Sequence, residues 1–305
     1  MSSIIHSMEI KFKKMTCKVC GNTMNLYFDN CFDINFSMTD NSFNWYKCKN
    51  CKLISISTHS SFIENIEEYY KEYDPHNHGV KSLSKFSNSS INKVIKDLKK
   101  SQNYTDEFTL LDVGCGSGNL LFNIRKHFKN SKLFGLDYNI QSVSNNLKGI
   151  NVKLYKGGLQ DLNSDSKFDI IISSQLLEHI DNPNEYVSFL KKHLKCNGIV
   201  YIDIPYVGSK SFRLFKSFWV HLDTPRHRNL FEIETLTSLF NEFEINQIET
   251  FGTGYAYISS IALLIKNKYG YSGFTIKPFM GFFISKIIEL FIKPDDKLFF
   301  KLVKK

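Results

Sequence analysis

From residue 109 onward, short apolar runs of strand length alternate with stretches of helical spacing. The predicted strands cover residues 109–113, 132–136, 152–155, 168–174 and 198–204. Between the last two, Pro183 precedes a run to Leu194 in which Tyr186, Phe189 and Leu190 share one helical face. Because the strands are apolar enough to be buried on both faces, the pattern predicts an α/β fold built on a parallel sheet.

Two helical patterns precede this region, with a turn-rich loop between them. The first covers residues 62–70, and the second repeats apolar residues from Ile91 to Leu98 at helical spacing. The loop contains His76 and His78, but no further ligand stands nearby, so a metal site there is disfavoured.

A glycine-rich turn joins the first predicted strand of the alternating region to its first helix. The turn is Gly114-Cys115-Gly116-Ser117-Gly118, and glycines at such a turn let the backbone approach a ligand. The second strand ends in Asp137, 25 residues after Asp112, where a carboxylate can accept hydrogen bonds from both hydroxyls of a ribose. Strand, glycine turn, helix and acid together predict a nucleotide-type site at the carboxyl edge of the sheet.

Two CxxC pairs lie near the N-terminus. They are Cys17-Cys20 and Cys48-Cys51, separated by 27 residues. Each CxxC turn can deliver two sulfurs to one tetrahedral zinc ion, because both side chains project from a tight knuckle. The segment between the pairs alternates well enough for short strands beneath the metal. The sequence therefore predicts a structural zinc ribbon that needs its Zn²⁺ to fold, with no open coordination position for catalysis.

Composition narrows the class of protein. The 305 residues are 42% hydrophobic and 23% charged, with 27 Phe and 15 Tyr, which excludes a disordered chain. The net charge of +9 permits attraction to phosphates, nucleic acid or anionic lipid, and does not choose among them. Residues 1–14 contain no apolar run typical of an export signal, so a cytoplasmic protein is expected. The odd number of cysteines, seven, argues against a disulfide framework.

Residues 111–118 resemble the donor loop of class I S-adenosylmethionine (SAM)-dependent methyltransferases, and the resemblance extends over about residues 108–250. Dehydrogenases of similar fold instead have the spacing G-x-G-x-x-G. The resemblance implies a Rossmann-like, seven-stranded sheet with SAM as cofactor. In that family the glycine loop passes the methionine part of SAM, the acid matching Asp137 holds the ribose, and the acid matching Asp161 lies by the adenine amine. The SAM-binding residues implied in this way are Asp112, Gly114, Cys115, Gly116, Gly118, Asp137, Tyr138, Asp161, Leu162 and Gln175.

The segment from Asp223 to His227 resembles a D-x-P-R-H stretch of methyltransferases from cell-surface polysaccharide and sugar-modifying pathways, several of which also begin with a Cys-rich zinc module. Arg226 and Arg228 suit an anionic ligand such as phosphate. The candidate catalytic bases are His227, His221 and His179, in this order. The alternative is that these residues only fix the loop after the fifth strand.

Glu178 precedes His179 and could orient it, although this pair could equally be a structural helix start. In metal-dependent ubiquinone-pathway O-methyltransferases and small-RNA methyltransferases, the corresponding place is E-x-x-E-H. Gln175 replaces the first Glu here, which argues against a catalytic metal.

The C-terminal part departs from a minimal methyltransferase. Residues 243–251 fit the sixth strand and residues 297–305 the antiparallel seventh, which leaves a helical insertion at about 252–296. Its two apolar helical candidates are 258–265 and 279–292. They could cap the site, form a homodimer face or contact a membrane surface through residues 255–292, and a cap or a dimer face is preferred. The longest uncharged stretch, 250–265, is too short to span a bilayer.

The sequence thus predicts a zinc ribbon at 1–58, a helical connector at 59–107 and a SAM-dependent methyltransferase domain at 108–305. The expected reaction is methylation of a sugar hydroxyl in a nucleotide sugar or surface glycan (capsule or O-antigen), by a cytoplasmic enzyme that can lie at the inner face of the membrane. Three further possibilities stay open: a nucleic-acid methyltransferase, a C-methyltransferase of a nucleotide-linked deoxysugar, and a non-enzymatic scaffold. The sequence argues against nucleic acid as a partner, because the basic residues are scattered and no Asn/Asp-Pro-Pro-Tyr/Phe tetrapeptide follows the fourth strand.

Overall fold

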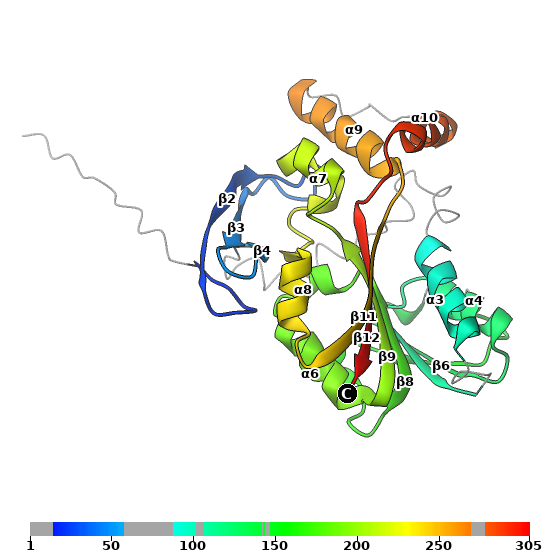
Figure 1. Cartoon of the computed structure of the whole chain (residues 1–305). Coiled ribbons are helices and arrows are strands. Elements are labelled where there is room, and N and C mark those ends of the chain that lie inside the picture. The colour runs from blue at the N-terminus through cyan, green and yellow to red at the C-terminus, as the bar shows by residue number, and fades with distance from the viewer. Residues whose placement is uncertain (1–14, 58–87, 102–106, 142, 144–146, 270–277) are drawn as a thin grey trace, which may run out of the picture.

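The computed structural model describes residues 15–57, 88–101, 107–141, 143, 147–269 and 278–305 (Figure 1). The helix predicted at 62–70 and the loop with His76 and His78 lie outside these ranges. The second connector helix is present as α3 (Asn88–Lys100).

The larger of the two sheets in the described part of the chain has seven strands. Its spatial order is β11 (Phe243–Phe251), β12 (Lys297–Lys304), β9 (Leu194–Pro205), β8 (Phe168–Ser174), β5 (Thr109–Val113), β6 (Lys132–Asp137) and β7 (Val152–Lys156). The five strands from β9 to β7 are parallel, whereas β12 is antiparallel to both of its neighbours. The carboxyl ends of the parallel strands therefore meet at one edge of the sheet, and the predicted seven-stranded α/β fold is confirmed.

Helices cover both faces of this sheet (Figure 1). On one face lie α3 and α4 (Asn119–His127), which pack on strand residues such as Leu110 and Ile170. On the other lie α6 (Pro183–His193) and α8 (Ile233–Leu239), which pack on the next residues along the same strands, Leu111 and Ile171. Successive residues of a strand point to opposite faces of the sheet, and helices cover both faces. These strands therefore have apolar residues at successive positions instead of alternating apolar and polar ones.

Helix α6 begins as the sequence predicts. The side chain of Asn182 accepts a hydrogen bond from Asn184 N–H, and Pro183 occupies the first turn. The helix ends one residue before Leu194, because β9 starts there rather than at residue 198. Leu194 pairs with Phe168, and the chain then bulges through Asn197, whose φ is +59°, before the regular pairing resumes.

The smaller sheet contains the CxxC pairs. Its strands, in spatial order, are β1 (Met15–Thr16), β2 (Thr23–Cys31), β3 (Phe43–Cys48), β4 (Ile54–Ile56) and β10 (Asn229–Leu230). Strand β10 belongs to the predicted methyltransferase domain, although it pairs with β4 of the predicted ribbon. Asn229 of β10 accepts a hydrogen bond from the Ser55 hydroxyl at 2.5 Å. The predicted ribbon and methyltransferase domain therefore share one sheet.

Arg226 joins the same two regions through a buried ion cluster. Its guanidinium donates to both carboxylate oxygens of Asp33, at 3.0 and 2.7 Å, and to Asp223 at 2.7 Å. The side chain is 1% exposed, so it cannot reach a phosphate, and the prediction that Arg226 binds an anion is wrong. Arg228 is likewise buried and ion-paired to Asp181 at 3.0 Å, and its contact with an anion stays a prediction.

Replacing Arg226 with leucine is expected to destabilise the fold by about 3–5 kcal/mol, because two buried carboxylates then lose their counter-charge. Denaturant unfolding measures this change, and Arg213→Leu, at an exposed arginine, is the control. The double variant Asp33→Ala/Arg226→Leu should lose less than the sum of the single variants. A loss below about 1 kcal/mol for Arg226→Leu would contradict the role of the cluster.

The insertion before β12 folds as two helices, as predicted. They are α9 (Tyr255–Tyr269) and α10 (Pro278–Phe291), and α7 (Lys210–Phe215) lies next to α9. Helix α10 exposes a row of large apolar side chains, among them Leu290 at 81% and Phe291 at 84%. No described helix has the length and apolar character needed to cross a bilayer. Whether α9 and α10 meet a second copy or a membrane surface stays a prediction.

Candidate active site

The glycine loop follows β5, at the carboxyl edge of the large sheet. Gly114, Gly116 and Gly118 have φ values of +71°, +49° and +75°, a region that side-chain-bearing residues rarely adopt. Gly114 N–H donates to the carbonyl of Leu136 at 2.8 Å, which ties the loop to β6. The glycine turn predicted from the sequence is therefore present.

Asp137 ends β6 beside this loop. One carboxylate oxygen accepts the Gly116 N–H and the other the Asn139 N–H, both at 2.8 Å. These bonds hold the carboxylate at the loop, and each oxygen keeps a second lone pair for a hydroxyl. This position fits the predicted contact with a ribose. The neighbouring Tyr138 is 69% exposed.

Asp112 and Cys115 are buried rather than open to a ligand. Burial raises the pKa of Asp112 to about 8, and the negative charge of Asp137 adds to the shift. The raised pKa favours the protonated form of Asp112 at neutral pH. The contacts of Asp112 and Cys115 with SAM stay predictions.

The turn after β7 lies next to Asp137 and Tyr138. Gly157 N–H donates to the carbonyl of Asp137 at 3.0 Å, and Gly158 N–H donates to the carboxylate of Asp161 at 2.8 Å. A side chain on Gly158 would lie 2.3 Å from the Tyr138 hydroxyl, so the two segments are in close contact. Leu162, which follows, is buried. The acid predicted to lie by adenine is therefore near the acid predicted to hold the ribose.

The segment after β8 packs against the glycine loop. A Cβ on Gly114 would lie 3.0 Å from the side chain of Leu176. Gln175 has a φ of +52°, and its amide donates to the carboxylate of Asp203 on β9 at 2.8 Å. The residues that follow Leu176 are thereby held next to the donor loop.

Two histidines and a glutamate come together at this place. Ligand atoms of Glu178, His179 and His227 all lie within 4.8 Å of one another, and the two imidazole rings are 4.7 Å apart. Nδ1 of His179 is 3.1 Å from the carbonyl of Arg226, and Nδ1 of His227 is 2.7 Å from that of His221. Because a carbonyl only accepts, both Nδ1 atoms are protonated and both Nε2 atoms have the lone pair.

Burial determines the charge of this group. It lowers the pKa of His227 to about 3, with a further contribution from His179, and it lowers the pKa of His179 as well. Burial also raises the pKa of Glu178 to about 8, and neither carboxyl oxygen of Glu178 has a hydrogen-bond partner among the described residues. Two neutral imidazoles therefore stand beside a buried carboxyl group that makes no hydrogen bond within the part of the chain that the structure describes.

His221 does not join them. Its Nε2 lies 3.4 Å from the carboxylate of Asp296, and its carbonyl accepts the hydrogen bond from Nδ1 of His227. The sequence could not show which of the three histidines lie at the site. The conformation of the loop from 220 to 228 determines which imidazole rings face Glu178. From the sequence, Glu178 was expected only to orient His179. Its proximity to His227 was not expected, because the two residues are 49 positions apart in the chain.

The donor set of Glu178, His179 and His227 also fits a divalent cation. Neutral imidazoles and a carboxylate are common ligands of zinc, manganese and iron, and a cation would compensate the unpartnered carboxylate. Gln175, whose identity argued against a metal, points to Asp203 and is not part of the set. The three remaining donors are close enough for one ion.

The four cysteines of the CxxC pairs also meet as predicted. Sγ of Cys17 is 3.5 Å from Sγ of Cys51, and Sγ of Cys20 is 3.4 Å from Sγ of Cys48. Thiolates bound to one zinc ion at about 2.3 Å lie roughly 3.8 Å apart, so the spacing is close to that of a tetrahedral site. The binding of zinc by these four cysteines stays a prediction.

The cysteine group gives a direct test. The purified protein should contain about one zinc ion per chain, and Cys48→Ser should lose it together with much of its thermal stability. Cys196→Ser is the matched control, because Cys196 is exposed and lies outside the group. A stable, metal-free wild-type protein would contradict the zinc assignment.

A seven-stranded sheet of this order, with a glycine loop after β5 and an acid after β6, defines a SAM-dependent methyltransferase. The family model described as "Methyltransferase domain" matches residues 76–249, more than half of the chain, and the chain belongs to this family.

Curated relatives include the ubiquinone biosynthesis O-methyltransferases of Rickettsia bellii and Rickettsia conorii. They are 30% identical over 118 residues and 28% identical over 109 residues, and the matches cover 37% and 35% of this chain and 48% and 38% of theirs. The chain thus spans about half or less of the length of these relatives.

Among solved structures, the 1,6-didemethyltoxoflavin-N1-methyltransferase of Burkholderia thailandensis matches with a TM-score of 0.51. The match covers 87% of this chain and 97% of that one at 12% identity, which shows a common fold.

Proposed function

We propose that this methyltransferase transfers the methyl group of SAM to a hydroxyl of a sugar, in a nucleotide sugar or a surface glycan. The observation that supports hydroxyl methylation is the group of Glu178, His179 and His227, held next to the donor loop by the contact of Leu176 with Gly114. A hydroxyl is a poor nucleophile until its proton is removed, and these side chains can bind and accept that proton.

The reaction needs alignment and one proton acceptor. The C–S bond of the sulfonium breaks as the C–O bond to the acceptor oxygen forms, and S-adenosylhomocysteine leaves. The Nε2 lone pairs of His179 and His227 can accept a hydrogen bond from the acceptor hydroxyl. With a pKa of about 3, His227 is too weak a base to keep the proton at neutral pH, although it was the first choice from the sequence. Glu178 holds a proton more firmly, with a pKa of about 8, and only its ionised form can accept the proton of the hydroxyl.

A divalent cation held by Glu178, His179 and His227 would lower the pKa of a bound hydroxyl. The protein's own part is then to fix the two imidazole rings through their Nδ1–H bonds to the carbonyls of Arg226 and His221.

The choice of a sugar rests on the resemblance of residues 223–227 to sugar-pathway methyltransferases that also have a Cys-rich module. A second candidate is the hydroxyl of a quinone precursor, favoured by the name of the curated relatives. C-methylation of a deoxysugar and methylation of nucleic acid would each give a chemically distinct product, and one assay of the methylated product separates all four reactions.

Purified protein, SAM and each acceptor class should therefore be combined with and without a chelator. We expect one methyl group on a sugar oxygen, located by mass spectrometry and NMR, and loss of the product in chelator if the three side chains act through a cation rather than directly on the hydroxyl proton. Methyl on carbon, on a phenol or on a base would contradict the sugar-hydroxyl assignment, and full activity in chelator would exclude the cation.

A further inference from the structure

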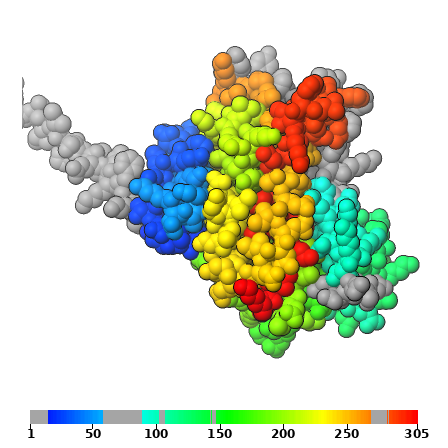
Figure 2. Space-filling model, viewed as in Figure 1, coloured from blue at the N-terminus to red at the C-terminus, as the bar shows by residue number. Residues whose placement is uncertain are grey.

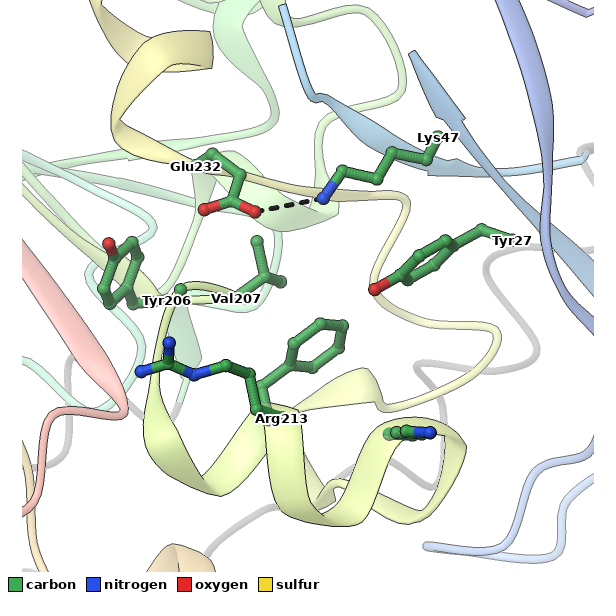
Figure 3. A pocket seen from close by; sticks show the side chains of 9 residues that line it. Tyr27, Lys47, Tyr206, Val207, Arg213 and Glu232 are labelled. Atoms are coloured by element: carbon green, nitrogen blue, oxygen red, sulfur yellow. Dashed lines mark hydrogen bonds and ion pairs between the residues drawn. The ribbon is translucent and has the colours of Figure 1, made fainter. Parts of the chain in front are cut away.

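A pocket of about 440 Å³ lies between the smaller sheet and the segment that follows β9 (Figure 3). Tyr27 and Lys47 reach it from β2 and β3, Tyr206 and Arg213 from the end of β9 and α7, and Glu232 from the start of α8. Figure 2 shows the smaller sheet, in blue, beside the yellow-green and yellow segments that include α7 and α8. Its volume lies within the usual range of roughly 300–1,000 Å³ for small-molecule sites.

Three cations and one carboxylate line the pocket, and Glu234 and Asp295 also lie close enough to Tyr206 to raise its pKa. Lys47 Nζ lies 3.1 Å from a carboxylate oxygen of Glu232, so these two lining charges balance each other. Arg213 and Lys216 remain, three residues apart and both exposed at the pocket. Two neighbouring cations suit a ligand with two phosphates, since an arginine can bind phosphate oxygens with two parallel hydrogen bonds.

The pocket also has aromatic walls. Tyr27 is 39% exposed, and its ring lies nearly parallel to that of Phe212, with an interplanar angle of 18°. Tyr206 is half-buried on the opposite side (Figure 3). Exposed flat rings next to cations are a common way to hold a nucleobase that is attached to phosphates.

The pocket is connected to the proposed catalytic group by one short stretch of chain. Arg228 N–H donates to the carbonyl of Glu178 at 2.6 Å, Phe231 pairs with Tyr206, and Glu232 lines the pocket. Tyr206 itself directly follows β9, whose carboxyl end lies at the edge of the sheet where ligands bind in folds of this kind.

We infer that this pocket binds a nucleoside diphosphate, the part of a nucleotide-sugar acceptor that is not methylated. This inference rests on the proposed function, because it assumes that the methyl acceptor is a nucleotide sugar. Binding of the nucleotide part would keep the sugar at the carboxyl edge of the sheet during transfer.

Calorimetric titration of the full chain with UDP and dTDP, in the absence of SAM, tests the pocket directly. We expect saturable binding of at least one of the two, and a loss of about tenfold or more in Arg213→Gln/Lys216→Gln. Lys210→Gln is the matched control, because Lys210 is exposed on the same helix but does not line the pocket. Tyr27→Ala should weaken nucleotide binding and leave inorganic pyrophosphate binding unchanged.

No saturable binding at millimolar concentration, or equal binding by the double variant, would overturn the inference. Kinetics with nucleotide sugars distinguish an acceptor from a separate regulator. UDP or dTDP that competes with the acceptor, and a raised KM in the double variant, support the acceptor role, whereas a nucleotide that changes kcat without competing overturns it. Nucleotide binding without any sugar methylation would overturn the proposed function and leave the pocket in place.

Discussion

Asp137→Ala is expected to weaken SAM binding by about 100-fold or more. Two hydrogen bonds from ribose hydroxyls to a carboxylate contribute about 1.5–3 kcal/mol each, and about 2.7 kcal/mol corresponds to 100-fold. The variant also loses the bonds that Asp137 accepts from Gly116 and Asn139, so the glycine loop itself should become less ordered. Calorimetric titration with SAM or S-adenosylhomocysteine measures the change.

Asp165→Ala is the control for this experiment, because Asp165 is exposed on the loop between β7 and β8. Its affinity for SAM should equal that of the wild type. The circular dichroism of Asp137→Ala should stay native, since the residue lies at the end of its strand. Affinity within about threefold of the wild type would show that Asp137 does not hold the ribose.

Glu178→Gln is expected to lower kcat by about 10²–10⁴-fold, the usual contribution of a positioned acid or base. The substitution keeps the shape of the side chain and removes its ability to accept the proton or to bind a cation as a carboxylate. The affinity for SAM should stay the same, because Glu178 lies beyond Leu176, outside the donor loop. The free energy of unfolding should not fall, since the variant has no buried carboxylate to desolvate.

Steady-state kinetics and denaturant unfolding should be measured on the same preparations, with Glu185→Gln as the control. Glu185 is exposed on α6, seven residues away, and its replacement should change neither activity nor stability. An unchanged kcat in Glu178→Gln would exclude Glu178 from the reaction. Loss of activity together with loss of stability would indicate a structural role instead.

The periodicity of the sequence was sufficient to predict the large sheet. Apolar runs such as 109–113 and 168–174 are central parallel strands, whose local pattern depends little on distant parts of the chain. The glycine turn and the CxxC pairs were also predictable, because positive φ values and thiolate spacing constrain residue identity locally. The residue at the end of β6, Asp137, faces the glycine loop as expected.

Contacts between distant segments were not predictable from the sequence. Arg226 resembles an anion-binding residue in its local context, and only the approach of Asp33, 193 residues away, shows that its charge is already compensated. The pairing of β10 with β4 likewise brings together segments that are far apart in the sequence. The choice between His221 and His227 depends on ring orientation, which residue type and spacing do not determine.

The most direct test of sugar-hydroxyl methylation is transfer of labelled methyl from SAM into an extract of the source cells. The products are separated into nucleotide-sugar, lipid-linked, polysaccharide, quinone and nucleic-acid fractions, and Asp137→Ala is run in parallel as the inactive control. The proposed function predicts label in the nucleotide-sugar or glycan fractions, released as an O-methyl sugar and absent with the variant. Label confined to the quinone or nucleic-acid fraction would contradict it.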